Sequence, residues 1–383
     1  MIRLDQVTTV TIAGAFVVGM ILVLLNSIRP LLIERLHLSE SRVDWLLSAL
    51  NISLIPMMLI SGMLIDKVGV RGVLIVGSLI TCVAIFDLSI SQSLTGTLAA
   101  IIMAGVGAAC LSTGSTVLML PAFYSGSEAA SQNMGNVFFG LGALLSPVLV
   151  GLLTHRLGYR RSLSMVAVVC LLPALFGSLT KAEIFDSPVK PGELASVLSD
   201  PVLWLAGAAF FLSGPLEASL GIWGGSYLKD QGFSERRAAW LLSGFWFALL
   251  ASRLVTALML AHDSPLNDIL QNWLIVLAAL GAGVTLGNLA GTRSRLGATV
   301  GVLLLGAFYG PIFPMLVARL FDHFQEKGTA YGAMFAIGTT GNLLFQPLIG
   351  GYARRSSLQR AMRLPMIMAI VLALVALILE LVR

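Results

Sequence analysis

Four charged residues lie inside stretches of the sequence that are otherwise apolar: Arg29, Asp87, Glu217 and Arg253. A charge in hydrocarbon surroundings costs several kcal/mol, so such a side chain usually faces an aqueous cavity or a partner. There, a carboxylate can load and release a proton, and an arginine can bind an anionic or hydroxylated solute. The alternatives are a fixed ion pair or, for Arg29, a side chain that reaches the membrane interface. For Asp87, near the end of its stretch, we favour an ordinary structural role.

The apolar stretches dominate the chain. Of its 383 residues, 57% are hydrophobic and 11% are charged, whereas soluble domains are about 25% charged. Crossing a bilayer takes about 20 apolar residues. Twelve stretches are long enough: residues 7–33, 43–65, 73–91, 95–121, 130–153, 161–180, 201–228, 237–260, 270–290, 296–320, 328–352 and 362–382. The sequence therefore predicts an all-α membrane protein with twelve transmembrane helices and almost nothing left for a soluble domain.

An internal repeat divides the chain into two halves. Segments 39–48 and 234–243 share Ser, Glu, Arg, Trp, Leu, Leu and Ser at a constant offset of 195. A second echo, at an offset of 200, joins the fifth predicted helix to the eleventh. Both offsets align each predicted helix with the helix six places later in the chain. We therefore expect two six-helix bundles, residues 1–180 and 201–383, related by a pseudo-two-fold axis and joined by a polar linker, residues 181–200.

The repeat also predicts where two of the charges lie. Subtracting 195 from Glu217 gives Leu22, and Leu22, Asn26 and Arg29 are spaced by four and three residues. These three residues share one helix face, so Glu217 should project from the equivalent face of the other bundle. We expect Arg29 to be the partner of Glu217, and Asn26 and Arg29 to help bind a solute.

A short charged segment, which we call the hinge segment (residues 62–74), joins the second and third apolar stretches. It reads Gly-Met-Leu-Ile-Asp-Lys-Val-Gly-Val-Arg-Gly-Val-Leu and leaves no room for a loop domain. Gly62 and Gly69 allow close backbone approach, and Gly69 can adopt a positive φ where the chain reverses. Asp66 can accept hydrogen bonds from free amides at the start of the next helix, whereas Lys67 and Arg71 can bind free carbonyls or lipid phosphates.

The pattern G-x-x-x-D-K/R-x-G-x-R/K in this segment resembles the signature between the second and third helices of the major facilitator superfamily. The resemblance implies a secondary transporter that works by alternating access, with two bundles rocking around a midplane site. It implies a gating role for the hinge segment, and both termini and the linker in the cytoplasm. Asp66 would steady one gated state by capping a helix end and pairing with a cation. Arg253, about two turns from the inner end of its helix, is a further gating candidate, although a structural bridge fits equally.

In this superfamily the first, fourth, seventh and tenth helices line a central cavity, which the resemblance places here at residues 7–33, 95–121, 201–228 and 296–320. The tenth stretch carries Gly306, Gly310, Pro311 and Pro314. Such helices bend where neighbouring groups satisfy the freed backbone, and in transporters these bends often flank the site.

Uncharged side chains complete the predicted solute site. Asn342 and Gln346 are four residues apart and share a helix face, and Asn136 and Trp223 are further candidates. Segments 105–113, 136–143 and 216–227 resemble the fucose-permease-like sugar branch of the superfamily. That branch tends to carry acids in the first and fourth helices, where this sequence has serines. The proton site typical of that branch is therefore missing here. The predicted coupling residue is Glu217, because a carboxylate near mid-membrane can load and release a proton as its surroundings change.

The distribution of basic residues runs against the orientation that the resemblance implies. Loops that would lie outside carry 14 Lys and Arg residues, and inner segments carry 8. The positive-inside rule prefers the reverse arrangement. That rule is statistical, whereas the signature that the hinge segment resembles usually lies in the cytoplasm. We therefore expect the hinge segment to face the cytoplasm, and the protein to lie in the plasma (inner) membrane. A basic outer rim could attract anionic solutes.

Other functions have less support. A membrane enzyme would need a nucleophile, a metal or an acid–base cluster, but the four histidines are scattered at helix ends. Neither a His-Glu-x-x-His motif nor a Gly-Lys-Ser/Thr phosphate loop is present. We therefore expect no enzymatic activity, metal, cofactor or nucleic-acid partner, and a monomer in the lipid bilayer. The charged and amide side chains, among them Arg29 and Glu217, favour transport of a small polar solute, either a sugar-like molecule or an organic anion. Proton-coupled symport and transport without protons both fit. A drug/proton antiporter and a non-transporting receptor are the alternatives.

Overall fold

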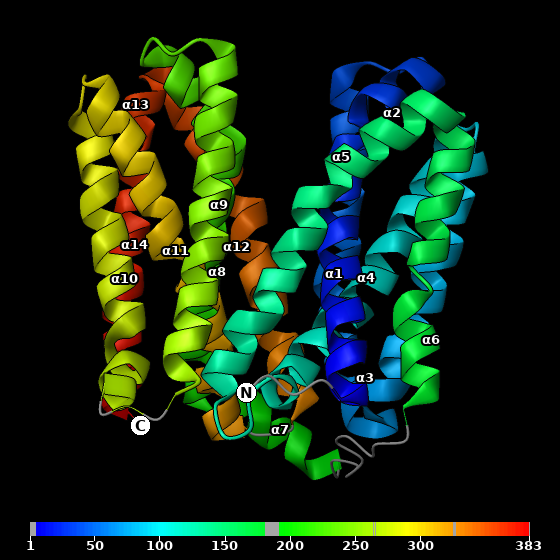
Figure 1. Ribbon diagram of the computed structural model, residues 1–383, viewed down its shortest axis with the longest axis horizontal. Helices are drawn as coiled ribbons and strands as arrows, with labels where there is room; N and C mark the ends of the chain where they lie inside the picture. Colours follow the sequence, from blue (N-terminus) through cyan, green and yellow to red (C-terminus); the bar gives the residue numbers. More distant parts are fainter. Residues whose placement is uncertain (1–4, 181–190, 263, 265, 325–326, 383) are drawn as a thin grey trace. The chain divides into compact units, whose positions relative to one another are not determined.

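The computed structural model describes residues 5–180, 191–262, 264, 266–324 and 327–382, and all regular elements of this part are helices (Figure 1). The first seven are α1 (Gln6–Ser27), α2 (Arg29–Leu36), α3 (Glu40–Ile90), α4 (Leu94–Ala122), α5 (Glu128–Val169), α6 (Leu172–Leu179) and α7 (Pro191–Ser199). The others are α8 (Pro201–Asp230), α9 (Glu235–Leu260), α10 (Leu266–Gly291), α11 (Arg295–Phe324), α12 (Gly328–Arg355), α13 (Leu358–Ala361) and α14 (Arg363–Val382). The predicted all-α fold is confirmed.

Two long helices each turn at a glycine. α3 has non-helical backbone angles at Gly69 (φ 79°, ψ 156°), and α5 has them at Gly158 (φ 77°, ψ 167°). Glycine adopts a positive φ without a steric penalty, because it has no Cβ. The turn at Gly69 was predicted from the hinge segment, and the turn at Gly158 is its counterpart between the fifth and sixth predicted stretches.

Nine helices in the described ranges are long and apolar enough to cross a membrane. Two of them, Glu40–Ile90 and Glu128–Leu179, contain 51 and 52 residues. At 1.5 Å per residue each would be about 75 Å long, more than twice the hydrocarbon core of a bilayer. Each therefore supplies two crossings, so the nine helices account for eleven crossings. α12, with 28 residues, covers the remaining predicted stretch.

The chain folds into two compact units. The N-terminal unit contains Met1–Gly126, Gly135–Leu198 and Phe324–Ala336, and the C-terminal unit contains Ser127–Met134, Ser199–His323 and Ile337–Arg383. The first turns of α12 thus belong to the N-terminal unit. Of the predicted linker, residues 181–190 lie outside the described residues, and residues 191–199 form α7.

In the N-terminal unit, hydroxyl groups tie neighbouring helices together. α3 and α1 pack on α4, and both also contact α6. Thr8 on α1 donates a hydrogen bond to the Ala122 carbonyl (2.6 Å), and Ser146 on α5 donates one to the Met20 carbonyl (2.9 Å). Such bonds satisfy buried polar groups where no water is at hand, which is how transmembrane helices accommodate serine and threonine.

In the C-terminal unit, α8 packs on α9 and α14, and α10 packs on α14. The Tyr227 hydroxyl of α8 donates a hydrogen bond to the Leu289 carbonyl of α10 (2.9 Å). Arg319 of α11 forms an ion pair with Glu380 of α14 (2.7 Å) and bonds the Asn272 side chain of α10 (3.0 Å). These contacts fix the helices that carry the candidate site described below.

Candidate functional site

Glu217 and Arg253 form an ion pair inside the C-terminal unit. The Arg253 Nη2 atom of α9 lies 3.1 Å from Glu217 Oε2 of α8, and its Nε donates a hydrogen bond to the Gly310 carbonyl of α11 (2.9 Å). The Arg253 side chain is only 3% exposed, whereas that of Glu217 is 27% exposed. The arginine is therefore fixed and buried, and the carboxylate is the accessible member of the pair.

The sequence of α11 explains why a carbonyl is free to hold Arg253. Proline has no N–H, so it cannot donate the helical hydrogen bond to the carbonyl four residues earlier. Pro314 thereby frees the Gly310 carbonyl, which accepts from Arg253, and Pro311 frees the Ala307 carbonyl. The Ser252 hydroxyl donates to that second carbonyl at 2.7 Å. The consecutive residues Ser252 and Arg253 thus donate hydrogen bonds to both backbone carbonyls that the two prolines leave without a helical donor.

Several buried polar atoms on the helices α8, α11 and α12 have no hydrogen-bond partner among the described residues. They are Tyr309 Oη on α11, Trp223 Nε1 on α8, and the side-chain oxygens of Asn342 and Gln346 on α12. The Gln346 amide nitrogen donates to the Pro215 carbonyl (3.2 Å), and the Asn342 amide lies against Gly214. The predicted common face of Asn342 and Gln346 is therefore confirmed, and it faces α8 one turn before Glu217.

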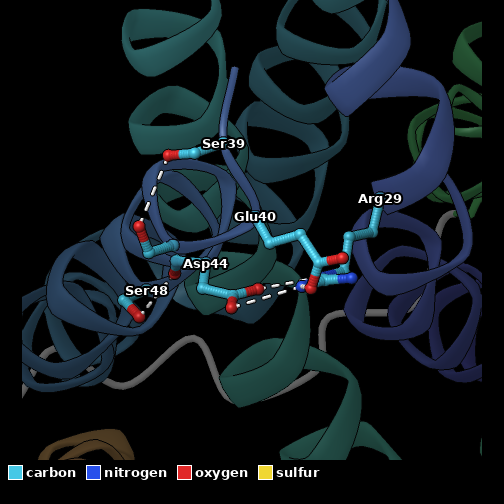
Figure 2. A network of polar contacts seen from close by, with 6 residues as sticks. Arg29, Ser39, Glu40, Asp44 and Ser48 are labelled. Atoms are coloured by element: carbon cyan, nitrogen blue, oxygen red, sulfur yellow. Dashed lines mark hydrogen bonds and ion pairs between the residues drawn. The ribbon is translucent and has the colours of Figure 1, made fainter.

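The predicted pairing of Arg29 with Glu217 is wrong. α1 ends at Ser27, and Ile28 departs from helical geometry (φ −93°, ψ 1°), so Arg29 begins α2 beyond the end of the spanning helix. Figure 2 shows its guanidinium directed at two carboxylates of α3. Arg29 Nε donates to Asp44 Oδ1 (2.8 Å), and Nη2 lies 3.3 Å from Glu40 Oε2. The hydrogen bond to Asp44 raises the pKa of Arg29 most, and the hydrogen bond to Glu40 raises it further.

The other two N-terminal candidates lie in different surroundings. Asn26 is exposed in the last turn of α1. Asn136 of α5 is buried, and its amide points to the Met119 sulfur at 3.8 Å. A role of either residue in solute binding stays a prediction.

The hinge segment holds the start of α12, not the start of the helix that follows it in sequence. Asp66 accepts hydrogen bonds from the Gly328 amide (2.5 Å), the Thr329 amide (2.9 Å) and the Thr329 hydroxyl. The first amides of a helix have no helical acceptor, and the dipole there favours a negative charge. The positive charge of Lys327 also acts on this carboxylate. The predicted capping by Asp66 is thus found at a helix 262 residues away.

Other residues of the hinge segment serve this contact or lie beside it. A Cβ at Gly62 would lie 2.4 Å from the Gly328 carbonyl oxygen, so glycine is needed for the two backbones to approach. Arg71 donates to the Ser178 carbonyl of α6 (3.0 Å), as predicted for a cation that binds free carbonyls at a helix end. Lys67 is exposed.

Comparison with known proteins agrees with this architecture. The family described as Major Facilitator Superfamily matches residues 11–345. The chain belongs to the major facilitator superfamily. As a member of the superfamily it is a multi-pass secondary transporter and not an enzyme, which confirms those predictions.

Three similar proteins illustrate the range of this superfamily. The transporter is 24% identical over 350 residues to the uncharacterized MFS-type transporter YfkL of Bacillus subtilis (strain 168), covering 88% of this chain and 87% of that protein. It is 24% identical over 345 residues to the nitrite extrusion protein of the same organism, covering 86% and 82%. The structure of the E. coli fucose:proton symporter FucP superposes with a TM-score of 0.80 at 15% identity, covering 97% of this chain and 99% of that one. The last likeness shows a shared fold.

Proposed function

We propose that this superfamily member moves a small polar solute by alternating access, that the solute binds beside Glu217, and that Glu217 couples its movement to protons. The observation that carries the proposal is the accessible carboxylate of a buried ion pair with unpartnered polar atoms on the helices around it. Charged residues within transmembrane helices usually mark substrate or proton pathways.

The unpartnered atoms support binding of a polar solute. Leaving a buried polar atom without a hydrogen bond costs about 1–3 kcal/mol. Trp223, Tyr309, Asn342 and Gln346 each carry such an atom, on α8, α11 and α12. A polar solute would supply partners for several of these atoms at once, whereas an amphipathic drug would leave most of them unpaired.

The N-terminal unit would contribute the remaining parts of the mechanism. Asn26, Arg29 and Asn136 stay proposed solute contacts, and Gly62, Asp66, Lys67 and Arg71 are proposed to act in gating. Arg253 acts first as the partner of Glu217, and any gating by Arg253 would work through that pair.

Two relatives bear on the kind of solute and on coupling. FucP is named as a fucose:proton symporter, and the extrusion protein is named for nitrite. Both solutes are small and polar, in keeping with the sugar-like or anionic solute that we propose. We further propose that the protein works as a monomer in a plasma membrane, with both termini in the cytoplasm.

Uptake into liposomes that contain the pure protein tests the proposal. With L-fucose and nitrite among the solutes, we expect saturable uptake that an inward proton gradient drives uphill. Glu217→Gln should abolish this uphill uptake and preserve exchange between equal pools. Gln346→Ala should raise KM about fivefold to tenfold, since one hydrogen bond contributes about 1–1.5 kcal/mol.

Asn288→Ala is a matched control, because Asn288 is exposed on α10 of the same unit. This variant should leave KM unchanged. Absence of flux above that of empty liposomes for every solute would refute transport. Uphill uptake by Glu217→Gln would refute the coupling role.

A further inference from the structure

The two members of the Glu217–Arg253 pair differ in exposure and in the number of groups that hold them. Arg253 is 3% exposed and is also held by the Gly310 carbonyl, whereas Glu217 is 27% exposed. A solute approaching this site therefore meets the carboxylate first. The Gly310 carbonyl holds the guanidinium by a contact that does not involve the carboxylate.

We infer that the solute is a small monoanion that enters together with one proton, by taking the place of the Glu217 carboxylate beside Arg253. This inference rests on the proposed function and adds the class of the solute and its stoichiometry. In the exchange, a proton from water binds the Glu217 carboxylate and the Glu217–Arg253 ion pair breaks. The anion then forms an ion pair with the guanidinium, so the site gains no net charge.

Each half of this exchange is unfavourable alone. Protonating Glu217 without an anion leaves Arg253 as a buried charge with no counter-ion, which is strongly destabilising. Binding an anion without a proton places two negative charges beside one positive charge. Both events together restore one cation and one anion, so proton and anion each raise the affinity of the site for the other.

Other classes of solute do not fit this arrangement. A neutral sugar supplies no counter-charge to Arg253, so its binding would not be linked to protonation of Glu217. A cation that paired with Glu217 would leave two positive charges beside one carboxylate. Only a monoanion exchanges with the carboxylate without changing the charge of the site.

Tyr309 provides the second observation for a ligand at this position. Its side chain is buried at 3% exposure, and its hydroxyl has no hydrogen-bond partner among the described residues. Tyr309 directly precedes Gly310, whose carbonyl holds Arg253, and it interacts electrostatically with Glu217. The hydroxyl can donate to the bound anion. Among the described residues, Arg253 from α9 and Tyr309 from α11 interact electrostatically with Glu217, and α12 contributes the neutral amide of Gln346, which bonds the Pro215 carbonyl.

Thermal unfolding of the purified full-length protein tests the exchange with chloride, nitrate, formate and lactate as probes and L-fucose as the neutral control. For the wild type, the apparent affinity for a stabilising anion should rise by up to about tenfold for each unit that the pH falls, since one proton is linked to one anion. Glu217→Gln mimics the protonated carboxylate. It should unfold at a lower temperature than the wild type without anions, and at least one probe anion should restore its stability equally at pH 6 and pH 8.

Two further variants separate binding from mere structure. Glu217→Gln combined with Arg253→Gln removes the unpaired charge, so it should recover stability without anions and respond to none of them. Tyr309→Phe should weaken anion binding about threefold to tenfold and leave its pH dependence unchanged.

Several results would overturn the inference. One is a Glu217→Gln protein that is as stable as the wild type without anions. Another is a destabilised Glu217→Gln protein that no probe anion restores, because an unpaired buried guanidinium should bind small monoanions with little selectivity. If Glu217→Gln does not fold, the wild type decides: its anion affinity must follow pH as stated, and liposome uptake of the stabilising anion must be electroneutral. Proton-coupled uptake of L-fucose with no response to anions would overturn this inference and leave the proposed function standing, whereas no flux of any solute would refute the proposed function itself.

Discussion

Replacing Asp66 by asparagine should loosen the first turn of α12 from the hinge segment. The carboxylate is 8% exposed and accepts hydrogen bonds from two backbone amides and one hydroxyl, those of Gly328 and Thr329. Asparagine keeps the shape of the side chain but has only one acceptor oxygen. Its NH2 group would face a donor, and the negative charge at the helix start would be lost.

The size of the effect follows from these contacts. A hydrogen bond to a charged group contributes about 1.5–3 kcal/mol, and a charge at a helix N-terminus adds about 0.3–1 kcal/mol. Asp66→Asn loses at least one of the bonds outright and weakens the others. We therefore expect a loss of about 2–4 kcal/mol for the docked state, which is about 30-fold to 1000-fold in its equilibrium constant.

Hydrogen exchange measured by mass spectrometry on the segment 327–336 reads this equilibrium directly. Exchange of its amides should speed up at least about 30-fold in Asp66→Asn, and transport turnover should fall while KM stays near the wild-type value. Asp87→Asn is the matched control, because Asp87 is a half-buried acidic residue in the other part of α3, beyond the turn at Gly69. Unchanged exchange and turnover in Asp66→Asn, or changes equal to those in Asp87→Asn, would refute a role in holding α12.

Three further predictions follow from the same unit. Gly62→Ala should abolish most transport, because its Cβ would lie 2.4 Å from a carbonyl oxygen of α12. The Cβ of Gly72→Ala would have its nearest neighbour at 3.6 Å, so this control should transport normally. Equal uptake by the two variants would contradict the prediction. Arg29→Ala should change the free energy of unfolding by less than about 1 kcal/mol, since exposed ion pairs contribute little. A larger loss would contradict this, and a tenfold rise in KM would support the proposed contact of Arg29 with the solute. Cysteine in place of Gln92 should react with an impermeant thiol reagent outside intact cells and cysteine in place of Ser125 should not, and the reverse labelling would overturn the orientation with the hinge segment in the cytoplasm.

The sequence alone determined the properties that depend on short segments. The length of each apolar stretch predicted the helices, because about 20 residues must span the hydrocarbon core. The hinge segment predicted the turn at Gly69, because glycine adopts a positive φ without a steric penalty. Its resemblance to a signature motif predicted the superfamily. The α12 pair Asn342 and Gln346 was placed on one face by helical periodicity, which needs no knowledge of neighbouring helices.

Tertiary structure decided which charged groups meet. The repeat related positions in the two halves by a pseudo-two-fold. Equivalence of that kind does not make two residues neighbours, so Arg29 was assigned to Glu217 in error. The true partner, Arg253, is on the helix next to α8, and Pro314 was the signal that could have indicated it by freeing the Gly310 carbonyl. Asp66 caps a helix that begins 262 residues later, a contact that no local pattern encodes. Hydrogen bonds and ion pairs act over about 3–4 Å in space, and separation along the sequence carries no information about that distance once the chain has folded.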